Sequence, residues 1–184
     1  MPQAKRRQHS VKGFTLIETM IALMVLAIGV LGLAAMLADS LSYMQGSQAD
    51  FIAQQKAQEA AEAIFTAKYN NPNNWAQISN NTGPNPNGLF MTGPQPLLEP
   101  GPDGLVGSIN DTGSSPEYTL LPGPDGKLGT PDDIKIPLTN YTRTIDIEND
   151  PNDSNLRTIK ITINYTVGRF TRSYVLNTDI SAFN

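Results

Sequence analysis

The 184-residue sequence contains no cysteine and only one histidine, His9. The absence of cysteine excludes disulfide bonds, thiolate zinc sites and cysteine nucleophiles. Ser114 and Ser115 lie in a Gly-Ser stretch, and no base that would activate either hydroxyl is identifiable. The acidic residues show no spacing that places two of them in one cleft, so they are more typical of a solvated surface. We therefore expect a protein that is not an enzyme.

Acidic residues are absent from the first thirteen positions, which hold four of the thirteen basic residues: Lys5, Arg6, Arg7 and Lys12. The other nine basic residues face seventeen acidic ones, so residues 14–184 carry a formal side-chain charge of −8. An acidic surface repels a phosphate backbone. We therefore expect no nucleic-acid binding by the body of the protein.

Charged and polar residues are absent from residues 20–38, which are apolar on all sides of a helix. Together with residues 14–19 they give about 25 residues, or roughly 37 Å of helix, which is enough to span a bilayer core of about 30 Å. Basic residues precede this run and Asp39 follows it. Because cytoplasmic flanks carry the excess of Lys and Arg, we expect the N-terminus to stay in the cytoplasm and the C-terminal body to lie outside.

A secretory signal peptide is an alternative interpretation, with the small residues among positions 34–38 as its cleavage site. The run is long for that, and Glu18 places a carboxylate in an apolar stretch, which costs about 2.5 kcal/mol or more in a bilayer. A helix that begins near Phe14 would hold Glu18 at its positive end, which recovers only about 0.3–1 kcal/mol. Cleavage after Gly13 would create an amine on Phe14 that compensates the carboxylate better.

The residues from Lys12 to Glu18 read Lys-Gly-Phe-Thr-Leu-Ile-Glu, between a short basic leader and the apolar run. This arrangement resembles the prepilin cleavage and N-methylation motif of type IV pilins and type II secretion pseudopilins, and the apolar run is most similar to that of minor pilins of the type IV pilus. The resemblance implies that a prepilin peptidase removes the leader, residues 1–13, by cutting between Gly13 and Phe14, and methylates the new amine on Phe14. It also implies that Glu18 pairs with a neighbouring subunit's N-terminal amine during filament assembly.

The resemblance further implies other pilin subunits, the prepilin peptidase, the inner membrane and the pilus assembly platform as partners. The chain would be a single-pass inner-membrane protein before it enters a filament outside the cytoplasm, either a pilus (fimbrium) or a pseudopilus. The leading prediction is a structural minor pilin, and a type II secretion pseudopilin carries the same motif. A third alternative, a single-pass membrane-anchored Ca²⁺-dependent binding domain, would keep its leader uncut and have no use for Glu18.

The helix is predicted to continue beyond the apolar segment, residues 14–38. Residues 39–69 combine polar residues with apolar ones at three- and four-residue spacing, which predicts an amphipathic half that packs on a sheet. Asn70, Asn71 and Pro72 are expected to end a helix of roughly 55 residues. The apolar stripe of this half is predicted to include Leu41, Met44, Ile52, Ala53, Ala57, Ala60, Ala61 and Ile64.

Residues 70–137 are predicted to be a variable loop region rich in Pro, Gly and Asn. Thirteen of the fourteen prolines fall between positions 72 and 151, which is incompatible with long helices there. Within this region, residues 117–121 are a candidate fourth strand of the C-terminal sheet.

The C-terminal residues 138–184 are predicted to form an antiparallel sheet. Residues 141–148, 156–167 and 170–178 alternate apolar or aromatic residues with polar ones, as strands do, and Gly168 marks a tight hairpin. We therefore expect an α+β fold that resembles the pilin architecture, with a long N-terminal α-helix packed on this sheet. The residues expected to face the helix are Ile145, Ile147, Ile159, Ile161, Ile163, Tyr174 and Leu176.

Two similar segments, residues 101–111 and 123–133, form an internal repeat offset by 22 residues. Hard oxygen ligands on a Gly-bent loop suit Ca²⁺, so the repeat is a candidate calcium site. Turn formation without an ion is the alternative, because Pro-Asp-Gly is a favourable turn sequence and the spacing does not match an EF-hand. The acidic loop is also loosely similar to the calcium loop that major pseudopilins carry as a family. The candidate ligands are Asp125, Asp132 and Asp133, followed by Asp103 and Asp111.

Overall fold

The computed structural model describes most of the chain, in three stretches: residues 13–70, 74–82 and 84–183. The predicted leader up to position 12, with His9, lies outside the described residues. So do Asn71 and Pro72, two of the residues predicted to end the long helix.

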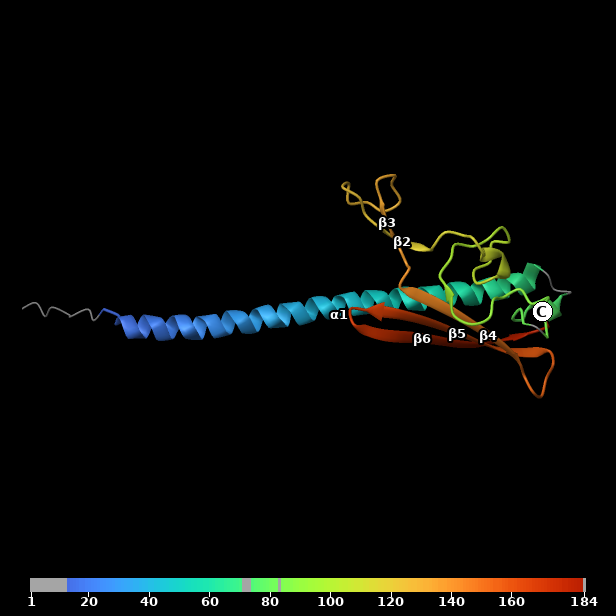
Figure 1. Ribbon diagram of the computed structural model, residues 1–184, viewed down its shortest axis with the longest axis horizontal. Coiled ribbons are helices and arrows are strands. Elements are labelled where there is room, and N and C mark those ends of the chain that lie inside the picture. The colour runs from blue at the N-terminus through green and yellow to red at the C-terminus, as the bar shows by residue number, and fades with distance from the viewer. Residues whose placement is uncertain (1–12, 71–73, 83, 184) are drawn as a thin grey trace, which may run out of the picture. The chain divides into compact units, whose positions relative to one another are not determined.

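The first element, α1 (Leu16–Asn70), is a continuous helix of 55 residues (Figure 1). The chain divides into two compact units, one ending at Met44 and one beginning at Gln45. Every described residue of the first unit is exposed, so its apolar surface has no cover within that unit. By length and composition, α1 is the one helix among the described residues that is able to cross a membrane. Leu41 and Met44, predicted in the packed stripe, are exposed because the second unit begins only after them.

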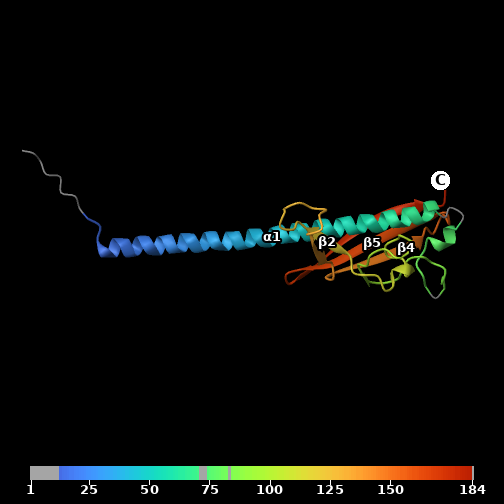
Figure 2. The same ribbon diagram turned by 90° about the horizontal axis from the view of Figure 1, so that it is seen from above.

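The second unit has a four-stranded antiparallel sheet in the order β1-β4-β5-β6 and a separate two-stranded sheet formed by β2 and β3 (Figures 1 and 2). The sheet and α1 confirm the predicted α+β fold with its long N-terminal helix. The bounds of the remaining elements are η1 (Trp75–Gln77), β1 (Gln95–Pro96), η2 (Ile109–Asp111), β2 (Tyr118–Leu121), β3 (Ile134–Pro137), β4 (Tyr141–Asn149), β5 (Leu156–Val167) and β6 (Phe170–Ser181).

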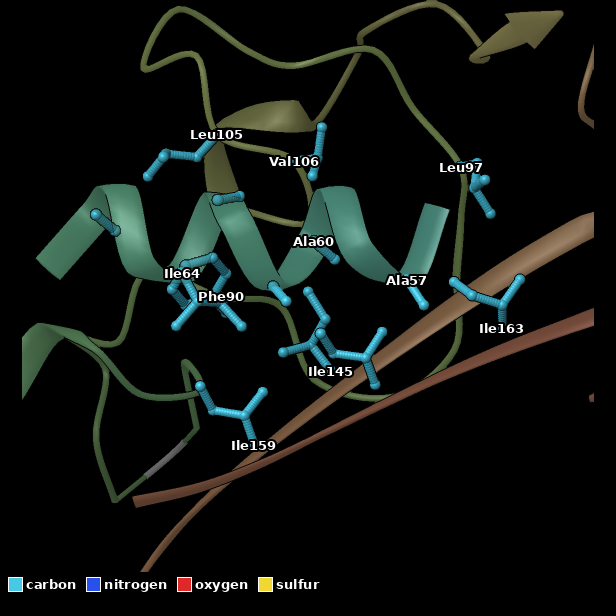
Figure 3. Packing of buried hydrophobic residues seen from close by; sticks show 14 of the residues in the cluster. Ala57, Ala60, Ile64, Phe90, Leu97, Leu105, Val106, Ile145, Ile159 and Ile163 are labelled. Atoms are coloured by element: carbon cyan, nitrogen blue, oxygen red, sulfur yellow. The ribbon is translucent and has the colours of Figure 1, made fainter. Parts of the chain in front are cut away.

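The core of the second unit lies between one face of α1 and the inward residues of the sheet (Figure 3). Fully buried Ala57 and Ala60 have small side chains, which let the sheet lie close to the helix. Alternate isoleucines of β5 are also fully buried, and each contributes about 1.5–3 kcal/mol relative to exposure. The predicted packing face is confirmed at Ala53, Ala57, Ala60, Ala61, Ile64, Ile145, Ile159, Ile161 and Ile163, with Ile147, Tyr174 and Leu176 partly buried against them.

The candidate strand at residues 117–121 is confirmed as β2, but the expectation that it is the fourth strand of this sheet is wrong. β2 pairs with β3 instead, and the two-residue strand β1 occupies the edge of β4. Beside β1, the Asn80 side chain donates a 2.7 Å hydrogen bond to the carbonyl of Ile145 and accepts one of 2.7 Å from the N–H of Ile147. β1 and the Asn80 side chain thus occupy the backbone N–H and C=O groups on the outer edge of β4. These groups are no longer free to pair with β2.

The hairpin between β5 and β6 is confirmed. Val167 pairs with Phe170 across a two-residue turn. Gly168 in this turn has a φ of 60°, a backbone conformation that residues with a Cβ rarely adopt. The pairing continues to Leu156 and Ser181, so β6 is covered on one edge over its whole length.

Candidate functional site

The predicted cleavage point lies just before the start of α1. Gly13 and Phe14 have non-helical backbone, and Phe14 is 82% exposed. Among the described residues, no atom outside its chain neighbours lies within 4 Å of the position that a Cβ on Gly13 would take. Proteolysis occurs preferentially in exposed, non-helical segments. The bond between these two residues is therefore presented in a form that a peptidase can bind.

Thr15 and Glu18 form a capping box at the start of α1. The Glu18 N–H donates to Thr15 Oγ1 at 3.3 Å, and the Thr15 N–H donates to Glu18 Oε2 at 3.4 Å. Such a pair satisfies two N–H groups that the first helical turn leaves without partners. The Glu18 carboxylate is thus directed toward the N-terminal end of its own helix, where it accepts a hydrogen bond from Thr15, the residue that follows Phe14. The roles of Gly13, Phe14 and Glu18 in cleavage, methylation and assembly stay predictions.

The internal repeat in the sequence is also a structural repeat. We call residues 101–111 the first acidic loop and residues 123–133 the second acidic loop. The glycines at the fourth and seventh positions have positive φ in both loops, 70° and 76° in the first and 69° and 86° in the second. In each loop the final aspartate accepts a 2.6 Å hydrogen bond from the N–H of the seventh-position glycine.

In the first acidic loop the carboxylates are satisfied by hydrogen bonds from the loop itself. Asp111 is fully buried and accepts hydrogen bonds from the N–H groups of Gly101 and Gly107, at 2.9 and 2.6 Å. Burial raises the pKa of Asp111, against the opposing effect of these bonds. Asp103 accepts a 2.8 Å hydrogen bond from the Asn110 amide. Burial acts to raise the pKa of Asp103, but hydrogen bonds from Asn110 and from the backbone outweigh it and lower that pKa.

The second acidic loop has Asp132 in the position that Asn110 takes in the first. The Thr130 Oγ1 lies 2.7 Å from an oxygen of Asp132, 3.4 Å from one of Asp133 and 3.5 Å from one of Asp125. One hydroxyl proton serves only one of these oxygens at a time. The hydrogen bond from Thr130 lowers the pKa of Asp132. The three strongest candidate ligands therefore converge on one hydroxyl.

No group of three or more His, Cys, Asp or Glu side chains is arranged to hold a metal ion in the described part of the chain. Calcium binding by the second acidic loop, and by Asp103 and Asp111 in the first, stays a prediction. The second acidic loop has a third carboxylate, Asp132, where the first has the amide of Asn110. The second loop is therefore the better candidate calcium site, because hard cations prefer carboxylate oxygens.

A buried ion cluster, which was not predicted from the sequence, joins α1 to β4. Glu117 pairs with Arg143, with Oε1 and Nη1 3.2 Å apart, and with Lys56, with Oε2 and Nζ 2.7 Å apart. Glu117 is 3% exposed and Arg143 is 2% exposed. Burial acts to lower the pKa of Lys56, but its pairing with Glu117 and Glu59 outweighs this and raises the pKa. The alternation along β4 contained the signal, because Arg143 lies two residues before Ile145 and so faces inward.

Residues 8–34 match the family model described as the prokaryotic N-terminal methylation motif. The chain therefore carries the prepilin-type signal of type IV pilins and pseudopilins, which confirms the resemblance drawn from residues 12–18. No curated protein and no solved structure matches the chain. The matched motif is a structural signal and does not define an enzyme family. It includes Gly13, Phe14 and Glu18 and ends within the apolar part of α1.

Proposed function

We propose that the protein is a structural minor pilin of a type IV pilus. A prepilin peptidase hydrolyses the bond between Gly13 and Phe14 and methylates the new Phe14 amine. The apolar part of α1 first holds the chain in the inner membrane with the N-terminus in the cytoplasm. The helix then passes into the filament through the pilus assembly platform, and the second unit is carried outside the cytoplasm.

One observation carries this proposal: the matched motif contains three features that filament assembly requires. The bond between Gly13 and Phe14 lies outside the helix, Glu18 lies in the first helical turn, and the apolar residues that follow are exposed within their own unit. An exposed carboxylate next to a membrane-spanning run requires a compensating charge. In a filament, the amine of a neighbouring subunit supplies that charge to Glu18. The acidic second unit has no identified catalytic group, so its proposed part is structural, in contact with other subunits or with surfaces outside the cell.

A pseudopilin of a type II secretion system is the second candidate. The second acidic loop favours it, because three carboxylates converge there just before the last strands and major pseudopilins carry a calcium loop as a family. Both candidates share the peptidase, the membrane step and the assembly role of Glu18. They differ in the filament that contains the chain.

Deletion of the gene in its native host separates the two candidates. A minor pilin is expected to change pilus number or pilus-dependent behaviour while secretion of exported enzymes continues. Antibodies to the second unit should then label sheared pili. Loss of secretion with normal pili would contradict the pilus assignment and support the pseudopilin.

A further inference from the structure

Strand β6 forms one edge of the four-stranded sheet (Figure 1), and its side facing away from β5 pairs with no strand among the described residues. The pairing with β5 runs without a bulge through twelve consecutive residue pairs, or about 40 Å of edge. One residue further on, the Ala182 N–H donates to the Asn155 carbonyl. Because bonded and non-bonded pairs alternate in an antiparallel ladder, the odd-numbered residues of β6 direct their N–H and C=O groups away from β5.

Strand β6 has few of the features that keep a sheet edge from pairing. Natural edge strands are protected by shortness, bulges, proline, charged side chains or a covering loop. β6 is long and contains no proline and no lysine. Its two charged side chains, Arg172 and Asp179, are already bonded to α1 and to β5 respectively. The opposite edge of the same sheet differs, because it has only the two-residue strand β1 and is also bonded by the Asn80 side chain.

The two faces of β6 define the chemistry of a strand that would pair with it. On one face, Tyr174 and Leu176 are only partly buried against the core. On the other face, Ser173 and Asn177 are exposed, and Val175 between them is 44% exposed. A fifth strand would cover the first face with apolar residues and place small polar residues along the second. The free edge therefore fits an extended segment in which apolar and small polar residues alternate.

We propose that the free edge of β6 binds such an extended segment of a different subunit, which adds to the sheet as a fifth strand. The backbone groups of the two strands provide affinity, and the alternate side chains provide specificity. The inference rests on the proposed function, because a minor pilin is present in few copies and has other kinds of subunit as neighbours. The protected edge at β1 limits this contact to one side of the sheet.

Photo-cross-linking in filaments identifies the occupant and its register. A photoreactive phenylalanine analogue is placed at Ser173 and, in a separate chain, at Asn177, and the adducts are mapped by mass spectrometry. We expect both positions to reach one segment of a different subunit, at sites about four residues apart, because paired strands advance together. The matched control places the analogue at Glu148, an exposed position of β4, and should give no adduct with that segment. Adducts with another copy of this chain, scattered adducts or none would overturn the contact.

Proline substitution tests the backbone pairing. The Val175 N–H faces away from β5, so Val175→Pro removes a donor from the free edge and none from the ladder with β5. In the chain with the analogue at Ser173, Val175→Pro should reduce the adduct several-fold, whereas Val175→Thr, which keeps the N–H, should leave it nearly unchanged. Equal adducts from the two variants would overturn strand pairing. Similar melting temperatures show that both variants fold, and the mapped register tests the pairing without the proline.

Processing is measured separately by N-terminal mass. An uncut chain contradicts the proposed function. A cleaved chain that enters filaments without forming the adducts overturns the strand contact alone.

Discussion

The Asp50 carboxylate in α1 accepts a 2.6 Å hydrogen bond from the Tyr165 hydroxyl in β5. Arg172 in β6 holds the same carboxylate, with its Nη1 3.0 and 3.1 Å from the two oxygens. The bond from Tyr165 lowers the pKa of Asp50, with a smaller contribution from Arg172 and against the effect of burial. Burial, together with the neighbouring Asp50, raises the pKa of Tyr165 to about 12. These contacts connect α1 to β5 and β6 near the start of the second unit.

Alkaline pH should release this contact. The pKa of Tyr165 is raised from an unfolded-state value of about 10, so its contribution to stability is complete below about pH 10 and is lost as the pH rises through about 12. The melting temperature of the full chain in detergent, followed by circular dichroism, should therefore fall in that window more steeply than that of a Tyr165→Phe variant. Asp50→Asn should move the fall toward pH 10, because it removes the charge that helps to raise the pKa. Identical pH profiles for the wild-type chain and Tyr165→Phe would contradict this.

Removal of Glu117 from the buried ion cluster should lower the free energy of unfolding. Glu117→Ala leaves the Arg143 guanidinium buried without its carboxylate, and loss of one partner of a buried pair costs about 3–5 kcal/mol. Denaturant unfolding of the second unit, measured with the full chain in detergent, gives the free energy of unfolding. The matched control is Glu148→Ala in β4, an exposed acid expected to change stability by no more than about 0.5 kcal/mol. A Glu117→Ala variant as stable as this control would show that solvent reaches the cluster.

Glu18→Ala should leave membrane insertion intact and block incorporation into filaments. The substitution removes the carboxylate that is proposed to pair with a neighbour's amine, while the apolar run that enters the bilayer is unchanged. Membrane and sheared-filament fractions are compared by immunoblot. Asp39→Ala is the matched control, because it removes a carboxylate at the other end of the apolar run. Normal amounts of the Glu18→Ala chain in filaments would refute the assembly role.

Calcium should raise the melting temperature of the full chain in detergent if the second acidic loop binds the ion. Asp132→Ala combined with Asp133→Ala should abolish the shift, because it removes two of the three converging carboxylates. Asp103→Asn in the first acidic loop is the control. Calcium should still raise the melting temperature of this variant, since the Asp103 carboxylate is already hydrogen-bonded to the Asn110 amide. The calcium prediction fails if the wild-type chain shows no shift.

The elements that local patterns define were predictable. Alanines at three- and four-residue spacing identified the packed face of α1, and alternating isoleucines identified β4 and β5. The cleavage motif was equally clear because its seven residues are contiguous. Each of these patterns lies within one helix, strand or contiguous segment. They could therefore be identified without knowing which residues far apart in the sequence contact one another.

The parts that depend on distant partners were not predictable. β1 has two residues and no period, and it pairs with β4 next to the groups of that strand that the distant Asn80 satisfies. Glu117 appeared to belong to a strand, whereas its neighbours in space are Lys56 and Arg143. The sequence also showed that the two acidic loops are similar, but only packing against α1 decides that Val106 is buried and Leu128 is exposed.

Cleavage and methylation at Phe14 can be measured from the intact mass and N-terminal sequence of the protein from native membranes, in cells with and without the prepilin peptidase. For a pilin, we expect a chain that begins with N-methylated Phe14 when the peptidase is present and with the uncut leader when it is absent. A chain that begins at Met1 in both strains, or that is cut near Ala38, would contradict assignment to the pilins.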